Sequence, residues 1–266
     1  MRISCVIPTK NRPEMTCRAI ASVVAQDTPV SEIIVVDDGS TDHTAAFVAA
    51  RFPEVRLVQR SGLGPGLARN AGVAEACGEV VMFLDSDDVW LSDHAASLMR
   101  TLARGYSVAY GVTKNYDQVG GGEFCIPEPG TAVEGHCLAA LARWCFLLLS
   151  SMAVKTEAFA AVGGFGGGEL GEDWSFLIRL ARRFSFGFCG EEPITLRHLH
   201  HGSLCNCASS DRLNALLVSV GLALAEAEAS CEEISRFQAL AEWTRRQGDW
   251  QTIQQWYISL KQEEVI

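Results

Sequence analysis

The sequence places three carboxylates directly after an apolar segment of strand length. Glu79 to Leu84 is mostly apolar, and Asp85-Ser86-Asp87-Asp88 follows it. Carboxylates this close repel one another unless a cation lies between them. Mg²⁺ and Mn²⁺ bind carboxylate and phosphate oxygens and take one or two protein carboxylates, which leaves room for a diphosphate. The motif therefore predicts a divalent metal site, and the alternative is a solvated turn in which Asp88 caps the next helix.

A second acidic turn, Asp37-Asp38, follows another apolar run at Glu32 to Val36. A carboxylate beside a flat heterocycle can accept a hydrogen bond from a ring N–H such as that of uracil N3. Asp38 is therefore a candidate for binding a nucleotide base. The alternative role for Asp38 is to cap the helix expected after Thr41.

Three further groups contain residue types that could do chemistry. Arg69 lies in a helix expected after a glycine-rich segment, where a guanidinium and backbone N–H groups can bind one phosphate together. Asp173 opens a helix after a second glycine-rich segment, so its carboxylate could face a cleft and take a proton from an acceptor hydroxyl. Its alternative role is to interact with the helix dipole. The imidazole of His198, His200 or His201 could complete a metal shell or contact a phosphate.

The first hundred residues contain the elements that would position these side chains. Apolar runs of strand length alternate with helical patterns that begin near Pro13, Thr41 and Gly66, which predicts a mostly parallel sheet flanked by helices. In an open parallel sheet, ligands bind outside the carboxyl ends of the strands, where the polar segments lie. A helix-like run at Val133 to Leu149 and a helix from Glu172 follow. The four predicted strands are Ile3 to Ile7, Glu32 to Val36, Val55 to Gln59 and Glu79 to Leu84.

Composition narrows the class of protein. The chain has 266 residues and a net charge of −10, and no dense basic face indicates a nucleic-acid partner. The apolar stretch Leu138 to Val154 contains Arg143, so we expect no transmembrane segment. The N-terminus shows no signal-peptide pattern, and ten scattered cysteines indicate reduced thiols. We therefore predict a cytoplasmic protein, with peripheral attachment to the inner face of a membrane left open.

Taken together, the motifs resemble those of the inverting family 2 glycosyltransferases with the GT-A fold, over about residues 3 to 205. They occur in the order and spacing of that family, and the resemblance implies an α/β GT-A domain. The matching segments are Val6-Ile7-Pro8-Thr9-Lys10-Asn11-Arg12, Val35-Val36-Asp37-Asp38-Gly39-Ser40-Thr41-Asp42, Gly66-Leu67-Ala68-Arg69-Asn70-Ala71-Gly72, Phe83-Leu84-Asp85-Ser86-Asp87-Asp88, Gly163-Gly164-Phe165 and Gly171-Glu172-Asp173-Trp174.

The resemblance also implies a role for each site residue. Lys10 stands where the family often has an aromatic residue, so Arg12 or Lys10 is expected to contact the base by a cation–π interaction. The implied roles are the base for Pro8, Thr9 and Asp38, the diphosphate for Arg69, the ribose for Asp85, the metal for Asp87, the metal or diphosphate for His200, and the general base for Asp173.

The implied activity is a metal-dependent, inverting transfer of a sugar from a nucleotide-diphosphate sugar to an acceptor hydroxyl. A UDP-sugar is the favoured donor, Mn²⁺ or Mg²⁺ the cofactor, and the acceptor a glycan, lipid or small molecule. The Gln-x-x-Arg-Trp motif of processive synthases is absent, which favours one sugar per encounter. We expect a nucleotide-sugar-binding half over 1–105, an acceptor-binding half over 106–208, and a helical C-terminal extension over 209–266.

Two alternatives remain open at this point. A nucleotide-sugar-binding or regulatory module without catalysis would keep the donor motifs but would not need Asp173. A sugar-nucleotide pyrophosphorylase shares the sheet and the metal requirement. It would need a basic glycine-rich loop after the first strand, and the segment Pro8 to Arg12 contains no glycine.

Overall fold

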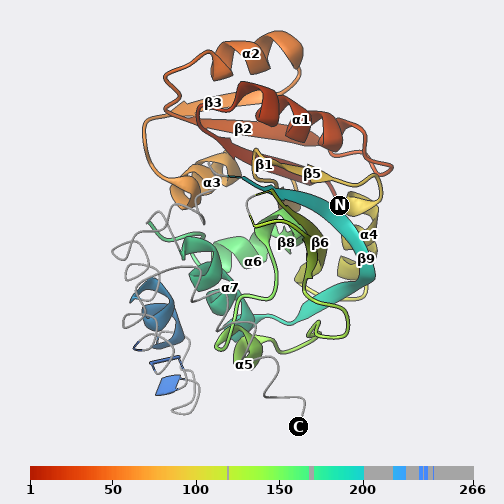
Figure 1. Ribbon diagram of the computed structural model, residues 1–266, viewed down its shortest axis with the longest axis vertical. Helices are drawn as coiled ribbons and strands as arrows, with labels where there is room; N and C mark the ends of the chain where they lie inside the picture. The colour runs from red at the N-terminus through yellow and green to blue at the C-terminus, as the bar shows by residue number, and fades with distance from the viewer. Residues whose placement is uncertain are drawn as a thin grey trace.

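The computed structural model describes residues 1–118, 120–167, 171–200, 218–225, 234–235, 237–238 and 242. Within these residues, nine strands form one sheet in the order β3-β2-β1-β4-β8-β6-β9-β5, with β7 paired to β6 (Figure 1). The strands are β1 (Ile3–Thr9), β2 (Glu32–Asp38), β3 (Arg56–Arg60), β4 (Val80–Phe83), β5 (Asp88–Trp90), β6 (Val108–Asp117), β7 (Glu123–Ile126), β8 (Met152–Lys155) and β9 (Phe186–Leu199).

Helices cover both faces of this sheet, as its apolar strands require. They are α1 (Pro13–Val24), α2 (Thr44–Arg51), α3 (Pro65–Ala74), α4 (His94–Leu102), α5 (Leu138–Leu141), α6 (Thr156–Ala161) and α7 (Glu172–Arg183), with a 3₁₀ turn, η1, at Leu149–Ser151. Residues 218–225 are also helical. No helix in the described ranges is long and apolar enough to cross a bilayer.

The predicted α/β class and the four predicted strands are confirmed. β3, β2, β1 and β4 are parallel, with Ile7 opposite Val35 and Val6 opposite Phe83. β6 and β9 are also parallel, whereas the pairings of β5, β7 and β8 are antiparallel. The carboxyl ends of the parallel strands therefore meet at one edge, where the polar segments begin.

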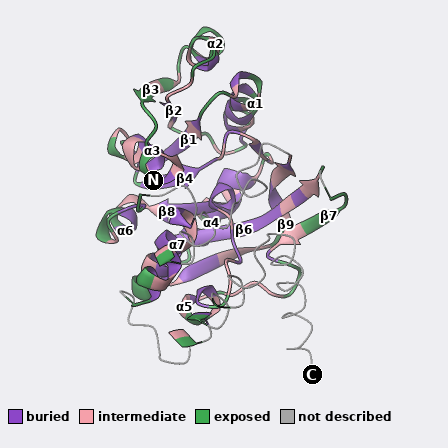
Figure 2. Ribbon diagram, turned by 60° about the vertical axis from the view of Figure 1, so that its left-hand side comes forward, coloured by how far each residue is buried: buried purple, intermediate pink, exposed green. Residues whose placement is uncertain are grey.

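Alternate residues of the strands build two hydrophobic cores. Val6 and Phe83 pack on the face covered by α3, α5 and α7, whereas Ile7 and Met82 pack on the face covered by α1 and α4. Figure 2 shows the central strands as largely buried. Because alternate residues of the same strands belong to the two cores, the helices on both faces of the sheet are packed against the same strands.

The helix predicted over Val133 to Leu149 is wrong for most of its length. Only Leu138–Leu141 is α-helical, and Gly135 forms an isolated bridge with Phe186. The amides of Gly135 and Phe186 each donate to the carbonyl of the other residue, and the Val133 amide donates to the Tyr110 hydroxyl. The backbone at the start of this run therefore bonds to distant residues instead of forming helical bonds.

The predicted C-terminal extension, 209–266, falls mostly outside the described residues. Within the described part of it, Val220 and Leu224 are buried in the core that also contains Phe176 of α7. Phe237 lies edge-on to Trp174, with ring centroids 6.3 Å apart. At least this part of the tail therefore packs on the helix that begins at Glu172.

Candidate active site

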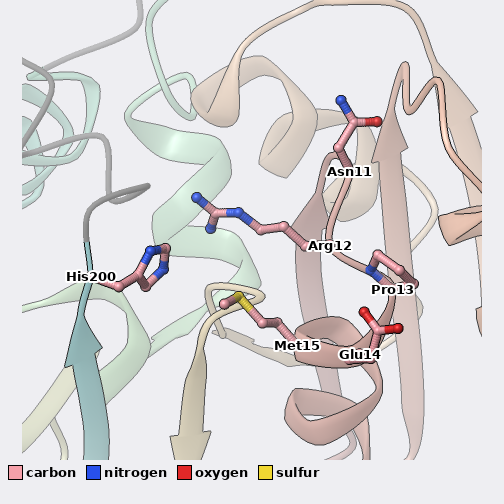
Figure 3. Close-up of a pocket in the computed structure, with 6 residues that line it drawn as sticks. All are labelled: Asn11, Arg12, Pro13, Glu14, Met15 and His200. Carbon is pink, nitrogen blue, oxygen red and sulfur yellow. The ribbon is translucent and has the colours of Figure 1, made fainter. Parts of the chain in front are cut away.

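The Asp87 carboxylate lies where three segments of the chain meet. The Arg12 guanidinium, at the start of α1, donates a hydrogen bond to Asp87 Oδ2 over 2.7 Å. His200 Nε2, just after β9, lies 3.2 Å from the same oxygen. Arg12 and His200 also line a pocket of about 290 Å³, where their side chains point toward each other (Figure 3). The structure thus brings together three residues that sequence analysis assigned to the site.

Asp87 and His200 are suitable donors for a divalent cation. A carboxylate oxygen and an imidazole nitrogen within 3.2 Å of each other can bind one ion. The described residues contain no group of three or more histidine, cysteine or acidic side chains that could do so. Two protein donors suit Mg²⁺ or Mn²⁺ at a diphosphate site, where phosphate and water oxygens commonly supply the other ligands.

A buried arginine connects two further carboxylates. Arg69 is 4% exposed, and its NH2 group donates to Asp85 Oδ1 at 2.5 Å while its NH1 group donates to Glu172 Oε1 at 3.0 Å. Burial opposes the charge on Arg69, but Asp85 and Glu172 raise its pKa above the usual range. Burial also raises the pKa of Glu172 to about 7, and the charge of Asp173 adds to this effect. Arg69 therefore joins a residue after β4 to the start of α7.

Asp173 lies in the first turn of α7, beside this arginine. Its side chain is half-buried, its Oδ1 accepts a hydrogen bond from the Trp174 amide, and its charge acts on both Arg69 and Glu172. The structure thus places the predicted general base next to the carboxylate network that begins at Asp85. Burial opposes the charge on Asp85, but Arg69 and, more weakly, Arg12 lower its pKa. Because Arg12 also bonds to Asp87, the Asp87 group and the Arg69 group lie within electrostatic range of each other.

Unlike Asp85 and Asp87, which bond to arginine side chains, Asp38 bonds to backbone amides of the segment before α3. Its carboxylate accepts hydrogen bonds from the amides of Leu63 and Gly64, at 2.7 and 2.8 Å. The proposed alternative, capping of the next helix, is wrong, because Asp42 Oδ1 accepts the Thr44 amide at the start of α2. A carboxylate has lone-pair sites beyond these two bonds, so Asp38 can still accept a bond from a base.

Pro8 and Thr9 end β1 beside Asp37 of β2. The Thr9 hydroxyl is buried and lies 2.6 Å from the hydroxyl of Thr16, so it holds α1 against the strand. Contact of Thr9 with a base therefore remains a prediction for its backbone. Asn11, which has a φ of 54°, joins the β1 and β2 loops by accepting a hydrogen bond from the Thr41 amide.

Asp88 does not cap a helix, contrary to the alternative considered for it. It lies in β5, it is buried, and burial raises its pKa well above the usual range. The Ser150 hydroxyl accepts the Asp85 amide at 3.1 Å and also bonds to Asp88. Sequence analysis missed Ser150, because it lies 65 positions from Asp85 and belongs to no motif.

Sequence analysis also assigned no role to Asn70 or to the carboxylate of Glu172. Asn70 donates to the Phe165 carbonyl at 2.8 Å and accepts the Phe165 amide at 2.9 Å. Both residues occur inside recognised motifs, and a search for partners between the motifs could have found them. Residues 168–170 of the glycine-rich segment before α7 lie outside the described residues.

Known proteins similar to this chain agree in their family. The model of glycosyl transferase family 2 matches residues 4–124. An uncharacterized glycosyltransferase of Nostoc sp. is 32% identical over 173 residues, which cover 61% of this chain and 53% of the relative. The succinoglycan biosynthesis protein ExoO of Rhizobium meliloti is 30% identical over 243 residues, covering 82% of this chain and 66% of the relative. The chain thus spans about half the length of the Nostoc protein.

The fold agrees with this family. The crystal structure of Staphylococcus aureus TarS, residues 1–349, in complex with UDP-GlcNAc superposes with a TM-score of 0.67 and 21% identity, covering 89% of this chain and 69% of the other. The motifs, the arrangement of the sheet and these matches agree, and the chain belongs to glycosyltransferase family 2, with the GT-A fold.

Proposed function

We propose that the chain is a metal-dependent, inverting glycosyltransferase that transfers one sugar per encounter from a nucleotide-diphosphate sugar to an acceptor hydroxyl. The observation that carries the proposal is that two hydrogen-bonded groups of side chains lie within electrostatic range of each other. They are Arg12–Asp87–His200 and Asp85–Arg69–Glu172, with Asp173 beside the second. The first group offers candidate ligands for a donor diphosphate and its metal, and Asp173 is the candidate base. The complex of TarS with UDP-GlcNAc supports a UDP-sugar as donor.

On the donor side, the chain offers both positive charge and metal ligands. Asp87 and His200 would hold Mn²⁺ or Mg²⁺, which neutralises negative charge on the leaving nucleoside diphosphate when bound. Arg12, beside Asp87, supplies a guanidinium that can bind a phosphate oxygen or stack on the base. Asp38 accepts a ring N–H of the base, which orients the donor.

On the acceptor side, Asp173 acts as the general base. Its carboxylate takes the proton of the acceptor hydroxyl, and the hydroxyl oxygen forms a bond to the anomeric carbon of the donor. The bond between that carbon and the diphosphate oxygen breaks, and the electron pair leaves with the nucleoside diphosphate. A single displacement from the opposite face inverts the anomeric centre. The absence of the Gln-x-x-Arg-Trp motif supports transfer of one sugar at a time.

Release of UDP tests this function without knowledge of the acceptor. The protein is incubated with UDP-GlcNAc, UDP-glucose or UDP-galactose and Mn²⁺, with water as the acceptor, and free UDP is measured over time. We expect slow release from at least one donor, lost on chelation and restored by Mn²⁺ or Mg²⁺. Binding of UDP with no release from any sugar nucleotide, with water or with added saccharides, would instead support a non-catalytic binding module.

A further inference from the structure

We infer that Arg69 and Glu172 are positioning residues, whose buried ion pair fixes the first turn of α7 against α3 and so sets where Asp173 lies relative to the donor. This inference rests on the proposed function, because it assigns Asp173 the role of base. Neither residue needs to contact the reacting atoms, since both act by fixing the position of the first turn of α7, which carries Asp173.

The Arg69 guanidinium bridges two distant parts of the chain. Its two terminal nitrogens donate to the carboxylates of Asp85, after β4, and Glu172, at the start of α7. The guanidinium is planar and rigid, so its two bonds fix the spacing of the carboxylates. Arg69 is 4% exposed and Glu172 is 6% exposed, so solvent screens the bond between them less than it would at the surface.

The N-cap position of α7 is Gly171, at a φ of 82°, so no side chain at that position bonds to the first amides of the helix. The first turn is bonded within itself through Asp173 and the Trp174 amide, and to α5 through the Trp174 indole, which donates to the Leu141 carbonyl. The Arg69–Glu172 pair supplies a bond from outside the helix at its first residue.

The residues of α3 that contact the α7 turn and the segment before it lie on one face of the helix. Gly66, Arg69 and Asn70 follow one another at helical spacing, so they lie on the same side of the helix. A Cβ atom at Gly66 would lie 2.8 Å from the Glu172 side chain, and Asn70 bonds to the backbone of Phe165 through both ends of its amide. In Figure 1, α3 lies between the β1–β3 part of the sheet and α7.

Substitution of Glu172 tests the inference. Glu172→Ala removes the bond to Arg69, and Glu172→Gln keeps an oxygen that can accept it. With Mn²⁺ and the UDP-sugar that the wild type hydrolyses, we expect Glu172→Ala to lower kcat for UDP release about 10-fold to 100-fold, as small displacements of a catalytic group do, with the donor KM changed less than about 2-fold. Glu172→Gln should recover most of the rate.

The matched control is Glu75→Ala, which also removes an arginine–glutamate pair next to α3. Glu75 pairs with Arg56 at 3.3 Å, but both side chains are exposed and lie away from the site. Its kcat and donor KM should equal those of the wild type. If Glu172→Ala does not fold, Glu172→Asp serves the same purpose, because it keeps the charge and shortens the reach to Arg69. We expect this variant to lose kcat as Glu172→Ala does.

The inference is overturned if Glu172→Ala keeps the wild-type kcat, or if Glu172→Gln loses as much rate as Glu172→Ala. Amide hydrogen exchange gives a readout that does not depend on activity. The first turn of α7 should exchange faster in Glu172→Ala than in wild type, and unchanged exchange there would also contradict the role. If the wild-type protein releases no UDP, the proposed function is contradicted. The amide exchange of the first turn of α7 would still show whether the Arg69–Glu172 ion pair holds that turn in place.

Discussion

At the scale of single residues, the groups proposed for donor binding and for proton transfer are separate. Asp87 bonds to Arg12 and lies against His200, whereas Asp173 lies near Arg69 at the start of α7. A substitution of Asp87 need not disturb the surroundings of Asp173, and the reverse also holds. This separation allows the two proposed roles to be tested by single substitutions.

Asp87→Ala should abolish Mn²⁺-dependent binding of UDP, because it removes the carboxylate ligand of the proposed metal site. Asp173→Asn should leave that binding intact and lower the rate of UDP release by about 100-fold to 10,000-fold, the usual contribution of a general base. Thermal shift with UDP, with and without Mn²⁺, measures binding, and a UDP assay measures the rate. Loss of UDP binding in Asp173→Asn would contradict the division of roles.

Glu172 gives the protein a pH-dependent stability with a defined sign. Its pKa rises from 4.5 to about 7 on folding, so the folded state binds its proton more tightly than the unfolded state. The free energy of unfolding therefore falls as pH rises through this range. Glu172→Gln does not titrate, so we expect its stability relative to wild type to increase by roughly 1 to 3 kcal/mol between about pH 5 and about pH 8.

Urea denaturation of both proteins at the two pH values measures this difference. The comparison cancels the titrating groups that do not interact with Glu172, and the effects of Arg69 and Asp173 on Glu172 stay in the measured difference. A difference that stays constant with pH, or that changes in the opposite direction, would mean that burial does not dominate the titration of this carboxyl.

At the scale of elements, the packing of α3 on the segment before α7 depends on a missing side chain. A Cβ atom at Gly66 would lie 2.8 Å from the Gly166 carbonyl oxygen and 2.8 Å from Glu172 Cγ. Gly66→Ala should therefore lower the free energy of unfolding by about 1 to 3 kcal/mol, despite the higher helix propensity of alanine. Urea denaturation measures the change.

The control for this prediction lies on the other side of the same contact. Gly166→Ala introduces a Cβ atom that would meet nothing within 4 Å. Its stability should stay within about 0.5 kcal/mol of the wild type, as is usual for exposed substitutions. Equal losses in the two variants would show that the spacing between α3 and this segment does not limit stability.

The sequence predicted the early elements well because their signals are local. The strands β1, β2 and β4 contain apolar runs, and Pro13 and Pro65 lie at helix starts. The helix predicted over Val133 to Leu149 is mostly wrong, because the backbone of Val133 and Gly135 bonds to distant residues, which no local pattern shows. The strands β5, β7 and β8 are short, so their pairing with distant strands had no periodic signal.

The candidate site was predicted as a set of residues but not as a network. Motifs at strand ends identified Asp38 and Asp87, because parallel strands bring their carboxyl ends together. The glycine-rich segment before a helix identified Asp173. The pairing of Arg69 with Glu172 joins residues 103 positions apart. No local pattern encodes such a pair, so only a search for charge partners between the motifs could have suggested it.

At the scale of the whole molecule, the predicted halves 1–105 and 106–208 share one sheet. β4 pairs with β1 on one side and with β8 on the other, and both cores cross this boundary. We therefore expect one cooperative unfolding transition, with tryptophan fluorescence and far-UV circular dichroism giving the same midpoint. Trp90 lies in the first half, and Trp144 and Trp174 lie in the second.

A fragment ending at residue 105 is the informative comparison. It would expose the edge of β4 that pairs with β8 and the apolar face of α3 and β4 that Phe159 and Phe165 cover in the intact chain. We expect this fragment to lack a cooperative transition. Separate midpoints for the two probes in the full chain, or a stably folded fragment, would show that the halves are independent units.

The position of Arg69 has a consequence for attempts to engineer this protein. A residue bonded to both Asp85 and Glu172 transmits a shift of either carboxylate to the other. Substitutions near Asp85 that are chosen to admit a new sugar nucleotide would then also change the rate of the proposed transfer step. Their effects would not add to those of substitutions near Glu172. A library that varies the surroundings of Asp85 and of Glu172 one after the other would miss combinations that work only together, so both regions should be randomised at once.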